Sequence, residues 1–81
     1  MKAYVTVMLK TTVLDPQGKT IHGALKKMGY KGVGGVRQGK FFEIALAEGI
    51  TTEQARKDVE TIAHDVLANP VIEEYRVEIV D

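Results

Sequence analysis

The segment KAYVTVMLKTTVLDPQG, residues 2–18, changes from the pattern of a strand to the start of a helix. From Ala3 to Leu9 every second residue is apolar, which is the two-residue period of a half-buried strand. Asp15 then precedes Pro16, a pairing typical of an N-cap residue followed by proline at the first helical position. This segment therefore predicts a strand followed by a helix that begins at Pro16.

The predicted helix extends to about Met28, where Gly29 is a plausible C-terminal cap. Its apolar stripe has helical spacing and consists of Ile21, Ala24, Leu25 and Met28. Residues 32–38 are rich in glycine and resemble a strand, and residues 41–46 form a clearer one. Because glycine adopts the positive φ that tight turns need, we expect these two strands to be joined by a turn near Gln38–Lys40.

A second helix is predicted from Thr51, which is spaced from Gln54 as in a capping box. Its apolar stripe consists of Val59, Ile62, Ala63 and Val66. The helix is expected to end at Asn69, because a residue before proline is disfavoured in the helical region. Alternating residues 71–79 then predict a last strand.

The element order is thus β-α-β-β-α-β, in which both β-α-β crossovers must be right-handed. An α+β ferredoxin-like plait satisfies this, with a four-stranded antiparallel sheet and both helices on one face. The length allows one domain, residues 1–81.

In this plait one sheet face carries apolar residues for the helices: Val5, Val7, Leu9, Phe42, Ile44, Leu46, Val77 and Ile79. The opposite face mixes Tyr4, Met8, Phe41, Ala45, Ile72 and Val80 with the charged residues Lys2, Glu43, Glu74, Arg76 and Glu78. Such a mixture is typical of an interface. We therefore interpret the open face as a docking surface.

Composition excludes several classes of function. The 81 residues include no Cys and no Ser, so disulfides, thiolate metal sites and the usual acyl-transfer nucleophiles are absent. Eleven basic and eleven acidic residues argue against nucleic-acid binding through phosphate neutralisation. The chain has no apolar run long enough for a membrane span, and we expect a cytoplasmic protein. So short a chain has a marginal core, which makes a homo-oligomer or a larger partner an expectation.

Two further sets of residues resemble parts of chemical sites. Residues 34–40 match the G-x-x-x-x-G-K part of a phosphate-binding loop, but Phe41 replaces the required Ser or Thr and a strand follows. His22 and His64 lack the surroundings of a metal or catalytic site and are interpreted as surface residues. Arg37, beside glycine-rich backbone, is the best candidate for an anion contact.

Three segments carry a resemblance to a known family: Val13–Gly18 (VLDPQG), Val36–Lys40 (VRQGK) and Leu67–Arg76 (LANPVIEEYR). With the length and element order, the chain resembles the PurS family, the small subunits of phosphoribosylformylglycinamidine (FGAM) synthase. The resemblance covers essentially the whole chain, and the LDPQG turn is its most specific part.

The resemblance implies a non-catalytic subunit of a purine-biosynthetic, ATP-dependent C–N ligase. In that family a PurQ-type glutaminase releases ammonia, and a PurL-type synthetase uses ATP and magnesium to convert formylglycinamide ribonucleotide to FGAM. A PurS dimer is thought to dock the two and protect the ammonia passage. No cofactor is expected on this chain, whereas the complex uses ATP, magnesium and glutamine. By itself the chain is expected to be a homodimer or tetramer.

Subunit contacts are expected at two segments, comprising Asp15, Pro16, Gln17, Gly18, Arg37, Gly39 and Lys40. The open face adds Tyr4, Met8, Phe41, Glu43, Ile72 and Arg76. Pro16 and Gly39 also have structural roles, in a helix start and a turn, whereas Gln17 and Arg37 are the stronger contact candidates.

Three other classes share this element order. An ACT-type regulatory domain, which binds amino acids near the loop after the first strand, is the main alternative. An acylphosphatase-like enzyme would need glycines and an arginine in residues 11–15, and neither is present. An RNA-recognition plait would suffer repulsion between phosphate and Glu43, Glu74 and Glu78 on the open face.

Overall fold

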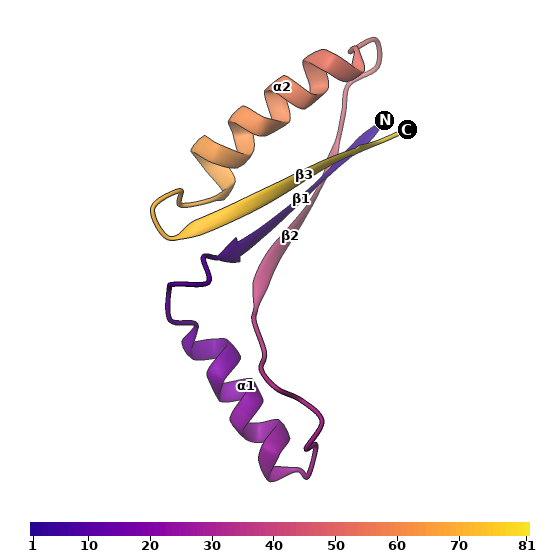
Figure 1. Cartoon of the computed structure of the whole chain (residues 1–81). Coiled ribbons are helices and arrows are strands. Elements are labelled where there is room, and N and C mark those ends of the chain that lie inside the picture. Colours follow the sequence, from indigo (N-terminus) through magenta and orange to yellow (C-terminus); the bar gives the residue numbers. More distant parts are fainter.

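The computed structural model describes all residues, 1–81. Its elements in chain order are β1 (Lys2–Leu9), α1 (Pro16–Lys27), β2 (Gly39–Ala45), α2 (Thr52–Ile62), a π-helical turn η1 (Ala63–Leu67) and β3 (Glu73–Val80). The strands form one antiparallel sheet in the order β2-β1-β3 (Figure 1). The α+β class is confirmed, but the sheet has three strands rather than four. No helix combines the length and the hydrophobicity required to cross a bilayer.

The strand predicted over residues 32–38 is absent, and so is the turn near Gln38–Lys40. Residues 33–38 are extended but belong to no sheet, and β2 begins directly at Gly39. The chain continues straight because the Gln38 N–H donates to Asp15 Oδ2 at 2.9 Å instead of closing a turn.

Gly39 is required for a reason other than the predicted one. Its φ is not positive; only Gly29 and Gly49 have positive φ. In the register of β1 and β2, Gly39 lies opposite Met8, and an added Cβ would collide with the Met8 Sδ and approach the Val7 carbonyl oxygen to 2.5 Å. Glycine therefore permits the close approach of two strands.

Helix α1 does not cover the sheet. Figure 1 shows it beyond the end of β1, at the far end of the molecule from α2, followed by the extended segment that returns to β2. Gly18 is its only buried residue. The prediction of two helices on one sheet face is therefore wrong for the single chain, in which only α2 packs on the sheet. We call residues 16–38 the arm.

The ends of α1 confirm the sequence prediction. The Gly18 N–H donates to Asp15 Oδ1 at 2.9 Å, which makes Asp15 the N-cap, and Pro16 opens the helix. At the other end Gly29 has φ +94°, and the Tyr30 N–H donates to the Leu25 carbonyl oxygen at 3.0 Å. This is a Schellman cap, and it reverses the chain into the extended part of the arm.

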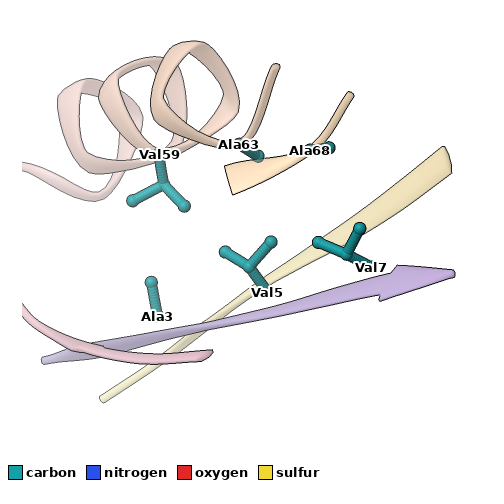
Figure 2. Packing of buried hydrophobic residues seen from close by; sticks show 6 residues of the cluster. All are labelled: Ala3, Val5, Val7, Val59, Ala63 and Ala68. Carbon is teal, nitrogen blue, oxygen red and sulfur yellow. The ribbon is translucent and has the colours of Figure 1, made fainter. Parts of the chain in front are cut away.

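The core lies between the centre of the sheet and α2 (Figure 2). Its fully buried members are Ala3, Val5 and Val7 from β1, and Ala55, Val59 and Ala63 from the helical segment. These side chains are all small, and larger, partly buried residues such as Phe42, Ile44 and Tyr75 pack around the cluster. Thr51 caps α2 as predicted, and its Oγ1 accepts the Gln54 N–H at 3.1 Å.

The apolar stripe predicted for the second helix is only half correct. Val59 and Ala63 are buried, whereas Ile62 is 36% exposed and Val66 is 73% exposed. Val66 is exposed because it lies in η1, in which the Ala68 N–H donates to the Ala63 carbonyl oxygen at 2.9 Å, five residues earlier. The extra residue in this turn moves Val66 into solvent and buries Ala68 instead.

Candidate interaction site at the neck of the arm

The arm joins the sheet at a neck formed by residues 15–18 and 36–40. Asp15 connects the two segments, because its Oδ1 accepts the Gly18 N–H and its Oδ2 accepts the Gln38 N–H, both at 2.9 Å. Gln38 lies 23 residues further along the chain. The two segments that the sequence suggested as subunit contacts are thus adjacent in space.

These hydrogen bonds lower the pKa of Asp15 below its ordinary value of 3.8. The bond from the Gln38 N–H is the largest cause, followed by that from the Gly18 N–H, and the positive charge of Arg37 adds to them. All three favour the charged carboxylate. The neck is therefore fastened by an ionised Asp15 at neutral pH.

Gly18 allows the two segments to cross closely. An added Cβ would collide with the Val36 carbonyl oxygen and lie 2.8 Å from Asp15 Oδ2. Gly18 is also the one buried residue of α1. Glycine is therefore needed at position 18 for packing within the neck, independently of any contact that it makes with a partner.

Arg37 belongs to the inner structure of the neck as well. Its Nη2 donates to the Leu9 carbonyl oxygen at 2.5 Å and lies 3.9 Å from Glu74 Oε1. The side chains of Arg37 and Glu74 are 47% and 59% exposed, so the ion pair contributes little stability. The exposed part of the guanidinium remains available to a partner.

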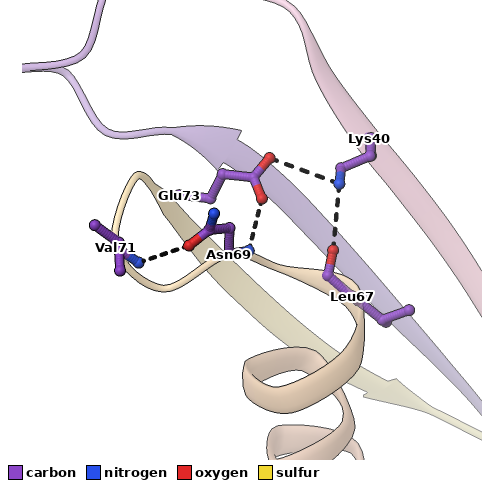
Figure 3. Close-up of polar contacts among 5 residues, drawn as sticks. All are labelled: Lys40, Leu67, Asn69, Val71 and Glu73. Carbon is purple, nitrogen blue, oxygen red and sulfur yellow. Dashed lines mark hydrogen bonds and ion pairs between the residues drawn. The ribbon is translucent and has the colours of Figure 1, made fainter.

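Lys40 links β2 to the end of η1 and to the start of β3 (Figure 3). Its Nζ donates to the Leu67 carbonyl oxygen at 3.3 Å and lies 3.6 Å from Glu73 Oε2. Glu73 Oε1 accepts the Asn69 N–H at 2.7 Å, and Asn69 Oδ1 accepts the Val71 N–H at 3.1 Å. The side chain of Glu73 is only 15% exposed, the lowest value among the ion-paired side chains of the neck.

A cleft of about 320 Å³ opens at the neck. It is lined by Val7, Leu9, Asp15, Pro16, Gln17, Gln38, Gly39, Lys40 and Glu73. Five of the seven predicted contact residues line it, and Gly18 and Arg37 adjoin it. Sequence reasoning missed Gln38 and Glu73. The signal for Glu73 is its place four residues after Asn69. At that spacing an acidic side chain can accept the backbone N–H of Asn69 at the start of the turn.

The open face, on the side of the sheet away from α2, has a small aromatic centre. The rings of Tyr4 and Phe41 stack with centroids 5.4 Å apart, and Phe41 is 65% exposed. Lys2 and Glu43 form an ion pair at 3.6 Å beside it. Strand register places Met8 and Arg76 on the same face. Ile72 was predicted there too, but it lies in the turn that precedes β3.

The two histidines have unrelated positions. His22 Nε2 lies 3.0 Å from the Val33 carbonyl oxygen and ties α1 to the returning segment of the arm. His64 Nδ1 lies 2.7 Å from Asp65 Oδ1, on the exposed side of η1. His22 is thus a structural residue of the arm, which the sequence did not indicate.

Comparison with known proteins gives consistent matches over nearly the full length. The family model described as "PurS: Phosphoribosylformylglycinamidine (FGAM) synthase" matches residues 2–81. The chain is 41% identical over 76 residues to phosphoribosylformylglycinamidine synthase subunit PurS of Mycobacterium leprae, covering 94% of this chain and 91% of that protein.

Solved structures agree with the sequence matches. The chain is similar to Bacillus subtilis PurS, with a TM-score of 0.84 and 39% identity, covering 99% of this chain and 98% of the other. It is also similar to a chain in the structure of PurLQS from Thermotoga maritima, with a TM-score of 0.83 and 33% identity, covering 95% and 93%. These likenesses do not favour the ACT-type alternative.

Proposed function

The chain belongs to the PurS family of FGAM synthase subunits, and from this premise we propose that it is the non-catalytic bridging subunit of such a synthase. The complex would convert formylglycinamide ribonucleotide, ATP, glutamine and water to FGAM, ADP, phosphate and glutamate in the cytoplasm. A PurL-type synthetase and a PurQ-type glutaminase would be its partners. The observation that carries the proposal is the match to the PurLQS structure over 95% of this chain.

The physical task of such a subunit is positioning. Ammonia released by a glutaminase is small and readily protonated in water, so it must reach the synthetase without leaving the complex. A third subunit that fixes the two enzymes against each other and excludes water at their junction supplies orientation and shielding. ATP, magnesium and glutamine would be bound by the partners, and residues 1–81 of this chain would act as one unit.

Two surfaces are available for the partners. The neck offers a cleft with Gln17, Lys40 and Glu73 on its walls, held in shape by the Asp15 hydrogen bonds. The open face offers the Tyr4–Phe41 stack with charged neighbours. Gln17 is the cleanest probe of the neck, because it is exposed and its side chain has no hydrogen bond within the chain.

The test reconstitutes the three subunits with Gln17→Ala or Arg37→Ala and measures turnover with glutamine and, separately, with added ammonia. We expect at least a several-fold loss of the glutamine-dependent rate and an ammonia-dependent rate that stays within about twofold. Gln54→Ala is the matched control, since it removes the same residue type from exposed α2. An unchanged glutamine-dependent rate for both variants would contradict the contact assignment.

A further inference from the structure

One side of α1 packs within the arm. Gly18, His22 and Leu25 follow each other at helical spacing and are the only residues of the helix that are not exposed. They face the returning segment of the arm, because an added Cβ at Gly18 would meet the Val36 carbonyl oxygen, and His22 Nε2 lies 3.0 Å from the Val33 carbonyl oxygen (Figure 1). The remaining sides of the helix are open.

The side of α1 away from its apolar stripe carries only positive charge. At about 100° per residue, four exposed residues fall within about 100° of the helix circumference: Lys19, Gly23, Lys26 and Lys27. We call them the lysine face. Ile21, in the apolar stripe, points to the other side of the helix. Whatever covers the stripe therefore leaves the lysine face on the outside.

The charges of the lysine face have no counter-charge within the chain. Lys2, Arg37 and Lys40 lie 3.6, 3.9 and 3.6 Å from glutamate oxygens, whereas the three lysines of this face form no ion pair. The whole arm contains five basic and no acidic residues. Helix surfaces that only need to be soluble usually mix charges of both signs. Solubility therefore does not explain a face of one sign.

The helix dipole explains only part of the arrangement. Lys26 and Lys27 lie in the last turn, where cations stabilise the negative end of the helix. Lys19 lies near the opposite end, where a carboxylate would be favoured, yet the first turn contains no acidic residue. The position of Lys19 thus opposes the stability of the isolated helix and indicates an anion outside the chain.

Gly23, in the middle of the lysine face, is also unexplained by the chain itself. Its φ is not positive, and an added Cβ would meet no atom within 4 Å. Glycine in a helix interior is less stable than alanine. Gly18 differs, since the carbonyl oxygen of Val36 leaves no room for a side chain there. A glycine without an internal reason allows another protein surface to approach the helix backbone closely.

The lysine face suits carboxylates better than phosphates. It contains no arginine, whose planar group pairs with phosphate in a bidentate way, and no aromatic side chain on which a base could stack. Residues 41–81 contain ten acidic and three basic residues, which repel a long polyanion or an anionic membrane. The space above Gly23 further favours a shaped protein surface over a diffuse cloud of charge.

We propose that the lysine face is a docking surface for an acidic patch on one of the two enzyme subunits of the synthase. Carboxylates of that subunit pair with Lys19, Lys26 and Lys27, and its surface packs against the helix backbone at Gly23. Ion pairs of this exposed kind mainly accelerate association and orient the partner. The inference rests on the proposed function and adds a third surface, on the outside of the arm, to the neck and the open face.

The charges are tested by the kinetics of association with each purified enzyme subunit and with both, in the presence of ATP, magnesium and glutamine. Lys19→Gln/Lys26→Gln is compared with Arg56→Gln/Lys57→Gln, which removes the same charge from the exposed side of α2. We expect the first pair to lower the association rate about tenfold at low ionic strength and to flatten its dependence on salt. The control pair should change the rate by less than about twofold. Circular dichroism should show both variants folded, because glutamine and lysine have similar helix propensities.

Gly23→Ala gives a result that a purely structural role would not produce. Alanine is the better helix former, so the Tm should stay the same or rise, whereas the affinity for the subunit should fall about threefold or more. Gly23→Leu adds bulk at a similar helix propensity and should lower the affinity further.

Several outcomes would overturn the inference. These are an unchanged association rate in the lysine pair, an equal loss in the α2 control, and an unchanged affinity in Gly23→Leu. Binding of the unmodified chain to poly(U) RNA or to phosphatidylserine vesicles that is lost in the lysine pair would assign the face to phosphate instead. In all these cases the glutamine-coupling test of the proposed function keeps its own result. A natural chain that binds neither enzyme subunit would refute the proposed function, and this docking surface with it.

Discussion

Replacement of Val59 by Ala tests how α2 and η1 are placed on the sheet. Val59 is fully buried against the β1 core. The change removes two methyl groups, about 1.6 kcal/mol of transfer free energy, and a cavity of about 50 Å³ adds about 1.2 kcal/mol. We therefore expect a loss of about 3 kcal/mol in the free energy of unfolding, equivalent to a fall in Tm of about 12–24 °C for a domain of this length.

Val66→Ala is the matched control, since it removes the same atoms seven residues later. Val66 is 73% exposed because η1 displaces it from the stripe that a regular helix would present. We expect its Tm to change by less than about 4 °C. Both variants are melted by circular dichroism at one protein concentration, because association makes Tm depend on concentration. If Val66→Ala costs as much as Val59→Ala, the π-helical register is wrong.

Two further predictions concern the neck and the sheet. The pKa of Asp15 is lower in the folded chain than its ordinary value of 3.8. The ionised Asp15 therefore stabilises the fold above pH 3.8, and this stabilisation is lost as the pH falls through the lowered pKa. Acid titration followed by circular dichroism should show a weaker dependence in Asp15→Asn, and an identical acid limb would contradict this. Gly39→Ala should weaken the β1–β2 pairing and lower the free energy of unfolding measured by chemical denaturation. Gly34→Ala should leave that free energy nearly unchanged, because an added Cβ there meets nothing within 4 Å.

Local signals in the sequence predicted both helix starts and the end of α1 correctly. Asp15 and Pro16 start α1, Gly29 ends it, and Thr51 caps α2, because each of these residues satisfies a backbone group within its own segment. Alternation also predicted the faces of the strands, because side chains of successive residues point to opposite sides. These features depend on neighbours a few residues away, which a sequence displays directly.

The errors arose where distant residues decide the conformation. The prediction of a turn at Gln38–Lys40 was wrong because the Gln38 N–H donates to Asp15. No local pattern at Gln38 indicates that bond. The prediction that Val66 belongs to the buried stripe of the second helix was wrong because η1 contains one extra residue. The neck itself was predicted as two separate segments, and only the tertiary structure brings them together around one carboxylate.

The π-helical turn makes the far wall of the neck cleft sensitive to chain length rather than to residue type. η1 takes up the one residue by which the helical segment exceeds a regular helix, whereas one more residue inserted in the regular part of α2 would rotate everything after it by about 100°. The Leu67 carbonyl oxygen would then turn away from Lys40, and the Asn69 turn would leave Glu73. A single-codon insertion in α2 would thus impair the neck while every side chain that lines it remained in the protein.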